Sequence, residues 1–141
     1  MSYLENIKKD GKNANPFFCL MGIDVISIEP GKAELKMQVR PEMHNGVGWL
    51  QGGILAAIAD EAMALALYSL LSGTEGIATI SESTSFIRGV QEGDIVAKAR
   101  VIRKVRRVAF AEGEVYSDNE GMTMLSRTSA AFAVTTNNNE K

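Results

Sequence analysis

The stretch HNGVGWLQGGILAAIADEAMALALYSLL, residues 44–71, decides the fold. It begins as a polar, glycine-rich loop and continues as a helical run in which every residue from Ile54 to Leu67 is apolar except Asp60 and Glu61. At about 3.6 residues per turn, such a helix leaves no polar face for water, so we expect it to be buried on every side. A domain of this size buries a helix in that way by curving a sheet around it.

Asp60 and Glu61 need an explanation in so apolar a helix. Carboxylates are rarely fully buried unless they are paired or functional, and a carboxylate kept in such a place is typical of an active site. Adjacent helical residues point about 100° apart, so one pocket receives only one of them. We expect Asp60 to face a pocket, and Glu61 to reach water at a seam or to pair with an arginine.

Composition limits the kinds of protein to consider. With 141 residues, 45% of them hydrophobic and 23% charged, we expect one domain, 1–141, with an N-terminal helix and loop over 1–15 and a frayed tail over 136–141. The net charge of −2 argues against general nucleic-acid binding. The single cysteine, Cys19, and the lack of an apolar signal core in the first residues indicate a cytoplasmic protein without a disulfide framework.

The apolar run is long enough to raise the question of a membrane span. Each acid at the centre of a spanning helix costs about 2.5 to 3.5 kcal/mol, and the chain has no second apolar run. We therefore expect no contact with a membrane.

Strands are predicted on both sides of the central helix. Side chains from Ala33 to Arg40 alternate between apolar and polar, which is typical of a half-buried antiparallel sheet. No regular alternation of strands with helices appears, so a doubly wound parallel sheet is not expected. The predicted class is α+β, with a curved antiparallel sheet of about six strands around one long helix. The strands are expected at Asp24–Glu29, Ala33–Arg40, Ile77–Ile87, Asp94–Lys104, Val108–Ser117 and Met122–Thr135.

This layout resembles the hotdog fold, and its central motif resembles the PaaI-like (phenylacetic acid degradation) acyl-CoA thioesterase family. The motif is N-x-x-G-x-x-Q-G-G-x-x-x-x-x-x-D, which runs from Asn45 to Asp60. The segment Phe86-Ile87-Arg88-Gly89 is similar to the strand end often written F-x-R-P in that family, and Thr79 falls where the family has Ser or Thr.

One position departs from the family pattern. Where the family usually has a histidine before the paired glycines, this chain has Gln51, whose amide forms hydrogen bonds but carries no proton at neutral pH. The only histidine, His44, lies seven residues earlier and is expected to have a loop or surface role.

The resemblance implies a thioester hydrolase that converts an acyl or aryl thioester of coenzyme A into the free acid and CoA without a cofactor or metal. It implies that the Gly52 N–H polarises the thioester carbonyl, and that Asp60 acts as general base or as nucleophile. Asn45, Gln51 and Thr79 complete the expected catalytic set. It further implies a homodimer, with dimers pairing into a tetramer and with sites at the subunit interface. The substrate is expected to contact Gly53, Trp49, Glu61, Phe86, Arg88, Arg106 and Arg107.

Some alternatives remain open at this stage. The six cations between Lys98 and Arg107, with no acid among them, are either a solvated strand face or a patch for the phosphates of CoA. Gln51 raises the alternative of a non-catalytic acyl-CoA-binding module on the same fold. A dehydratase of 3-hydroxyacyl thioesters would need a histidine in the site, and His44 is out of register. The sequence does not define the acyl group.

Overall fold

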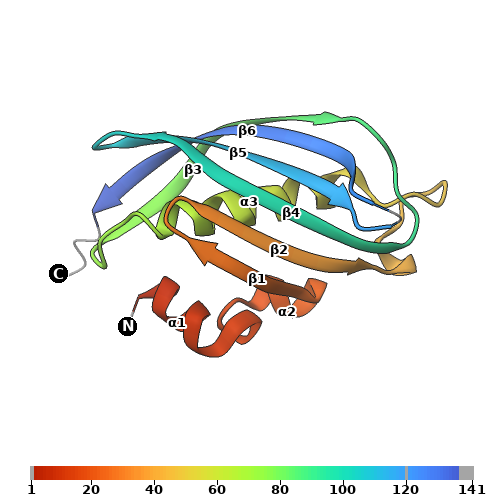
Figure 1. The fold of residues 1–141 in the computed structure, drawn as a ribbon, viewed down its shortest axis with the longest axis horizontal. Coiled ribbons are helices and arrows are strands. Elements are labelled where there is room, and N and C mark those ends of the chain that lie inside the picture. The colour runs from red at the N-terminus through yellow and green to blue at the C-terminus, as the bar shows by residue number, and fades with distance from the viewer. Residues whose placement is uncertain (1, 120, 137–141) are drawn as a thin grey trace.

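A computed structural model describes residues 2–119 and 121–136, and it forms a six-stranded antiparallel sheet curved around one long helix (Figure 1). The strand order is β1-β2-β4-β5-β6-β3. This arrangement confirms the predicted α+β class and the hotdog layout. In chain order the elements are α1 (Tyr3–Asp10), η1 (Gly11–Ala14), α2 (Pro16–Met21), β1 (Ile23–Glu29), β2 (Lys32–Val39), η2 (Pro41–Met43), α3 (Gly52–Tyr68), β3 (Glu75–Phe86), β4 (Gly93–Lys104), β5 (Val108–Ser117) and β6 (Thr123–Thr136).

The central helix α3 packs its large side chains against the concave side of the sheet. Leu55, Met63 and Leu67 are buried there, and β2, β4, β5 and β6 all contact the helix. The prediction that α3 is buried on every side is wrong for the single chain. The sheet covers one side of the helix, and a stripe on another side, marked by small residues at helical spacing and by two acids, stays only half-buried. Its members include Ala56, Ala57, Asp60, Glu61 and Ala64.

The length of α3 also bears on the question of a membrane span. The helix has 17 residues. Across the described residues, no helix combines the length with the apolar character that crossing a bilayer requires.

The N-terminal segment lies beside β1 at one edge of the sheet (Figure 1). Ser2 and Glu5 form a reciprocal cap at the start of α1. The short helix α2 was not predicted. Asn15 caps it by accepting hydrogen bonds from two of its N–H groups, and Phe18 anchors it in the core. Residue 1 and residues 137–141, which include most of the predicted tail, lie outside the described residues.

Strand β3 forms the other edge of the sheet and contains a β-bulge between Thr79 and Ser81. Thr79 lies opposite Phe132, and Glu82 lies opposite Ala130. Both partners on β6 are buried towards the helix, and directly opposite residues of an antiparallel pair share a face. The extra residue in the bulge therefore brings Thr79 and Glu82 to the same, helix-facing side, although strict alternation separates them.

Gly113 on β5 is expected to tolerate no larger side chain, because a Cβ there would lie 3.3 Å from both the Ala59 carbonyl oxygen and Met63 Cγ. Gly113→Val should lower the free energy of unfolding by about 1 to 3 kcal/mol. The matched control is Gly73→Val, where a Cβ meets nothing within 4 Å, and it should change stability by less than about 0.5 kcal/mol. Urea unfolding at one protein concentration measures both, and equal effects of the two variants contradict the prediction.

Candidate active site

The first turn of α3 presents an open backbone donor. The side-chain Oε1 of Gln51 caps the helix by accepting from the Gly53 N–H, and the Gln51 N–H itself donates to the Met43 carbonyl at 3.0 Å. Within the described part of the chain, the Gly52 N–H donates to no protein acceptor. A Cβ at Gly52 would lie 3.2 Å from the Phe86 ring. The loop thus delivers a free N–H at the positive end of a helix dipole, which suits a developing oxyanion.

Asp60 and Thr79, two of the residues selected from the sequence, lie in contact. The Thr79 hydroxyl donates to Asp60 Oδ1 at 3.2 Å, and Asp60 is half-buried on the stripe of α3 that the sheet leaves uncovered. Asp60 follows Gly52 by eight residues, or about 12 Å along the helix axis. A reacting carbonyl needs its donor and its attacking group each within about 3 Å. The Gly52 N–H and Asp60 of one chain therefore do not converge on one carbonyl.

Glu61 faces the N-terminal helices. The Asn15 side-chain amide donates to Glu61 Oε1 at 3.4 Å and to the Tyr3 hydroxyl at 2.8 Å. Burial is the largest cause of a raised pKa for Glu61, and the charge of Asp60 raises that pKa further. The contact is with an amide, whereas the sequence analysis had considered water or an arginine.

Glu82 is a carboxyl group that the sequence analysis did not select. The residue is exposed as a whole, yet burial of its carboxyl end, followed by its hydrogen bond to Asp60 and the charge of Asp60, raises its pKa to about 7. It is the only acid from Ile77 to Ile87, which was an available signal. Alternation counted from Thr79 assigns it to the wrong face, however, and only the bulge reverses that assignment.

In the part of the chain that the structure describes, no basic side chain forms a salt bridge with these acids. Among the salt bridges of the described residues, none involves Asp60, Glu61 or Glu82. No group of three or more His, Cys, Asp or Glu side chains in the described ranges is arranged to hold a metal ion.

The loop before α3 owes its shape to Asn45. Its side-chain Oδ1 accepts from the N–H groups of Val47 and Trp49 at 3.0 and 3.1 Å. Asn45 therefore fixes the shape of the loop. Among the described residues, none of its side-chain hydrogen bonds is with Asp60. The His44 ring lies away from the carboxylates, with its Nε2 2.8 Å from the Gln91 carbonyl oxygen.

Trp49 and Arg88 line one cavity next to this loop. The Trp49 ring covers Gly89, where a Cβ would lie only 2.8 Å from the ring, so the close contact depends on glycine. The cavity holds about 390 Å³ and is also lined by Val90, Gln91, Ser117 and Leu125. Phe86, 58% exposed beside Gly52, leaves an apolar surface at the same end of α3.

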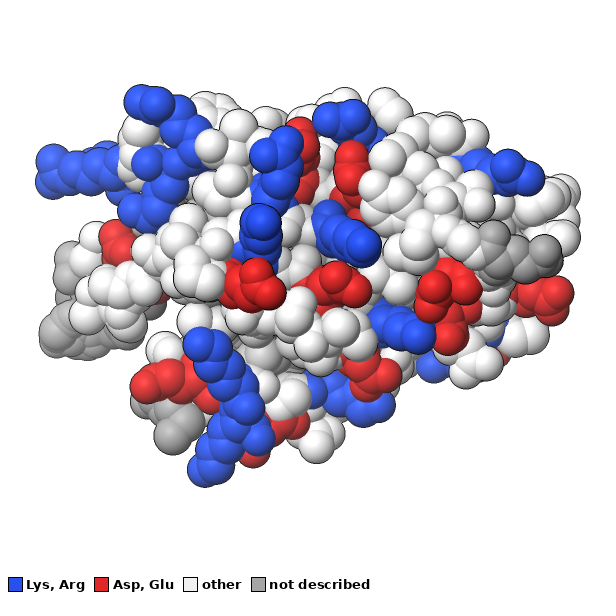
Figure 2. Space-filling model, viewed as in Figure 1, with Lys and Arg blue, Asp and Glu red and all other residues white. Residues whose placement is uncertain are grey.

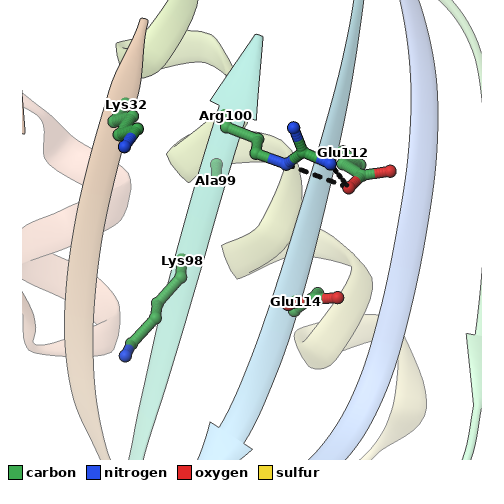
Figure 3. A pocket seen from close by; sticks show the side chains of 6 residues that line it. All are labelled: Lys32, Lys98, Ala99, Arg100, Glu112 and Glu114. Atoms are coloured by element: carbon green, nitrogen blue, oxygen red, sulfur yellow. Dashed lines mark hydrogen bonds and ion pairs between the residues drawn. The ribbon is translucent and has the colours of Figure 1, made fainter. Parts of the chain in front are cut away.

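The six cations between Lys98 and Arg107 do not form one patch. Arg106 and Arg107 line a cavity with Glu75 at the β4–β5 hairpin, at the far end of the sheet from the loop before α3 (Figure 1). Figure 2 shows Lys and Arg side chains gathered at that end. Lys98 and Arg100 instead line a hollow on the face of the sheet away from α3, where Arg100 is paired with Glu112 at 2.7 Å (Figure 3).

Comparison with known proteins places these features in a family context. Residues 48–124, more than half of the chain, match the family described as "Thioesterase superfamily". The chain is 30% identical over 110 residues to acyl-coenzyme A thioesterase PaaI of Escherichia coli, covering 76% of this chain and 75% of that protein. It is 28% identical over 119 residues to acyl-coenzyme A thioesterase 13 of Homo sapiens, covering 84% and 85%. A solved thioesterase family protein from Silicibacter pomeroyi shares the fold, with a TM-score of 0.85 and 20% identity over 94% of this chain and 98% of that one.

Removing the charge of Glu61 is expected to stabilise the protein increasingly as pH rises. The fold raises the pKa of this carboxyl above its ordinary value of 4.5, so the native state binds more protons than the unfolded chain in that range. The stability present at low pH is therefore lost as pH rises through the raised pKa. Glu61→Gln has no carboxyl group to titrate at this position, so its free energy of unfolding does not fall in this way as pH rises.

Urea unfolding between about pH 4 and pH 8 measures the difference in free energy of unfolding between variant and wild type. Glu34→Gln, on β2, is the control for loss of a glutamate charge. A difference for Glu61→Gln that stays constant or shrinks with rising pH contradicts the prediction.

Proposed function

Because the chain belongs to the thioesterase superfamily and is a thioester hydrolase, we propose that it hydrolyses an acyl or aryl thioester of coenzyme A to the free acid and CoA. The observation that carries this proposal is the contact at 3.2 Å between the Thr79 hydroxyl and the Asp60 carboxylate, midway along an otherwise apolar helix. The proposed reaction uses no metal and no cofactor.

The chemistry divides between a donor and a carboxylate. The Gly52 N–H binds the thioester carbonyl oxygen and stabilises the negative charge that develops on it. Asp60 either takes a proton from the attacking water or attacks the carbonyl carbon itself to form a mixed anhydride. In both routes Thr79 orients the carboxylate through its hydrogen bond. Gln51 and Asn45 act by fixing the helix start and the loop that hold the donor.

The distance between donor and carboxylate supports a site shared by two copies of the chain. One copy supplies the Gly52 N–H and another supplies Asp60, because about 12 Å separates the two residues along one helix. Within the described residues, strand β3 has a partner strand on one side only. It carries exposed Ile80 and leaves a row of backbone groups that a second copy can pair. The stripe of α3 that the sheet leaves uncovered is a second surface that another copy of the chain can contact in this proposed assembly. The proposed unit is a homodimer, with two dimers forming a tetramer.

The substrate-binding residues follow from the same arrangement. Trp49, Phe86 and Gly53 offer apolar surface and close backbone approach near the donor, and Arg88 offers a guanidinium for a phosphate of CoA. Arg106 and Arg107, at the far end of the sheet, contribute to a site only through another copy.

Asp60→Asn should reduce thiol release by at least about 10²-fold with every thioester that the wild type accepts, because the amide neither takes up a proton nor attacks a carbonyl. The measurement is release of free thiol from a panel of aryl and straight-chain acyl-CoAs, made in a Cys19→Ser background because Cys19 is exposed and reacts with thiol reagents.

Asp24→Asn is the matched control, since Asp24 is an exposed residue of β1. It should leave the rate unchanged, and circular dichroism should show that both variants are folded. Full activity in Asp60→Asn contradicts the assignment. Tight binding of acyl-CoA by the wild type without any release favours the binding-module alternative.

Light scattering should give a mass of two or four times the 15.2 kDa of one chain. Ile80→Lys puts a charge on the open edge of β3 and should lower both the mass and the rate of thiol release. A wild type that is fully active as a monomer contradicts the shared site.

A further inference from the structure

We propose that Glu82 is a second catalytic carboxyl group, which gives its proton to the departing thiolate while Asp60 activates the attacking water. The inference rests on the thioester hydrolysis proposed above. It identifies the source of the proton that the sulfur leaving group takes up.

The geometry of β3 brings Glu82 to the carboxylate. The bulge after Thr79 places both Thr79 and Glu82 on the side of the strand that faces α3, opposite the buried residues Phe132 and Ala130 of β6. From there the Thr79 hydroxyl donates to Asp60 Oδ1 at 3.2 Å, and Glu82 lies close enough to Asp60 for that side chain to raise the pKa of Glu82. Asp60 thus faces one hydroxyl, in direct contact, and one carboxyl group from a single strand.

The other candidate groups around the site have contacts of their own or do not titrate. Glu61 on α3 bonds to Asn15, and the His44 ring bonds to a loop carbonyl. Gln51, which stands where the family has histidine, caps the helix and does not titrate. The residues of β6 that face α3 along this part of β3 are Thr128, Ala130 and Phe132, none of which exchanges a proton near neutral pH.

Electrostatics favours one shared proton on the pair. Two carboxyl groups in contact, with no base beside them, do not both ionise readily. Burial and the neighbouring Asp60 raise the pKa of Glu82 to about 7, so Glu82 keeps its proton in about half of the molecules at that pH. A base beside an acid suits hydrolysis by general base and general acid, as in other enzymes where environment separates the roles of two carboxyl groups.

The reaction balances with these two groups. Asp60 takes a proton from water as the water oxygen bonds to the carbonyl carbon and the carbonyl electron pair moves to the oxygen held by the Gly52 N–H. The intermediate then collapses, the carbon–sulfur bond breaks with its electrons on sulfur, and the Glu82 proton moves to sulfur to form the thiol. Asp60 passes the proton it received to Glu82 through their hydrogen bond. The net change is thioester plus water to acid plus thiol.

The test compares leaving groups that do and do not need a proton. Glu82→Gln keeps the size and a hydrogen bond but holds no transferable proton. With a fixed acyl group, it should lower kcat on the alkyl thioester of coenzyme A by roughly 10²-fold or more. On the corresponding thiophenyl ester, whose aryl thiolate leaves without a proton, the loss should be under about threefold, because general-acid assistance contributes little there. Glu34→Gln should match the wild type on both esters.

The pH profile supplies a second readout. In the wild type, kcat on the CoA thioester should fall as pH rises through about 7, where Glu82 loses its proton, and this fall should be absent in Glu82→Gln. Equal losses on both esters, with the alkaline fall retained, overturn the proposal and leave Glu82 a structural role. Unchanged rates in Glu82→Gln overturn it as well.

Carboxyl ¹³C NMR titration separates this inference from the proposed function because it needs no activity. The Glu82 signal, identified by its absence in Glu82→Gln, should titrate near pH 7 in the wild type and at lower pH in Asp60→Asn. A wild type that releases no thiol while this titration is seen refutes thioester hydrolysis and leaves the carboxyl pair intact. If the wild type releases thiol but Glu82 titrates at the pH of an ordinary glutamate, the inference about the carboxyl pair is refuted and the proposed thioester hydrolysis stands.

Discussion

The packing of α3 against a sheet that curves around only part of it is the constraint on which the rest of the structure depends. Leu55, Met63 and Leu67 fill the concave side of the sheet. On the side of the helix that the sheet leaves uncovered, the residues are as small as Ala56 and Ala64. Because those alanines leave room, a carboxylate remains half-buried at mid-helix without being sealed into the core. Stability and reactivity therefore come from different sides of one helix.

Local signals in the sequence were sufficient for the architecture. Period-two alternation in β2 is read within a few residues, and the predicted strand bounds agree closely with those observed. Features that depend on tertiary contacts were not accessible. The helix α2 forms because Asn15 caps it and Phe18 packs into the core. The apolar residues of this segment do not by themselves indicate either contact.

The candidate site shows the same division. Asp60 was found because an acid in an apolar helix is a local anomaly, and Thr79 was found because its position resembles the family pattern. Glu82 was missed because a bulge changes the count of faces along β3, and bulges leave no reliable composition signal. The cations between Lys98 and Arg107 look like one patch in sequence, yet Lys98 and Arg100 lie on β4 and line one hollow, whereas Arg106 and Arg107 lie in the turn after it and line another.

The bulge in β3 also limits how this strand can change in evolution. Thr79 and Glu82 lie opposite Phe132 and Ala130, which are two residues apart on β6, so deletion of the one extra residue near Ile80 would leave a regular strand in which both still face α3. With two residues between them, as here, the bulge is needed to bring both to the helix. Among homologous chains, one intervening residue in a regular strand and two intervening residues with a bulge therefore both bring a carboxyl group and a hydroxyl to the helix, irrespective of which residues fill the gap.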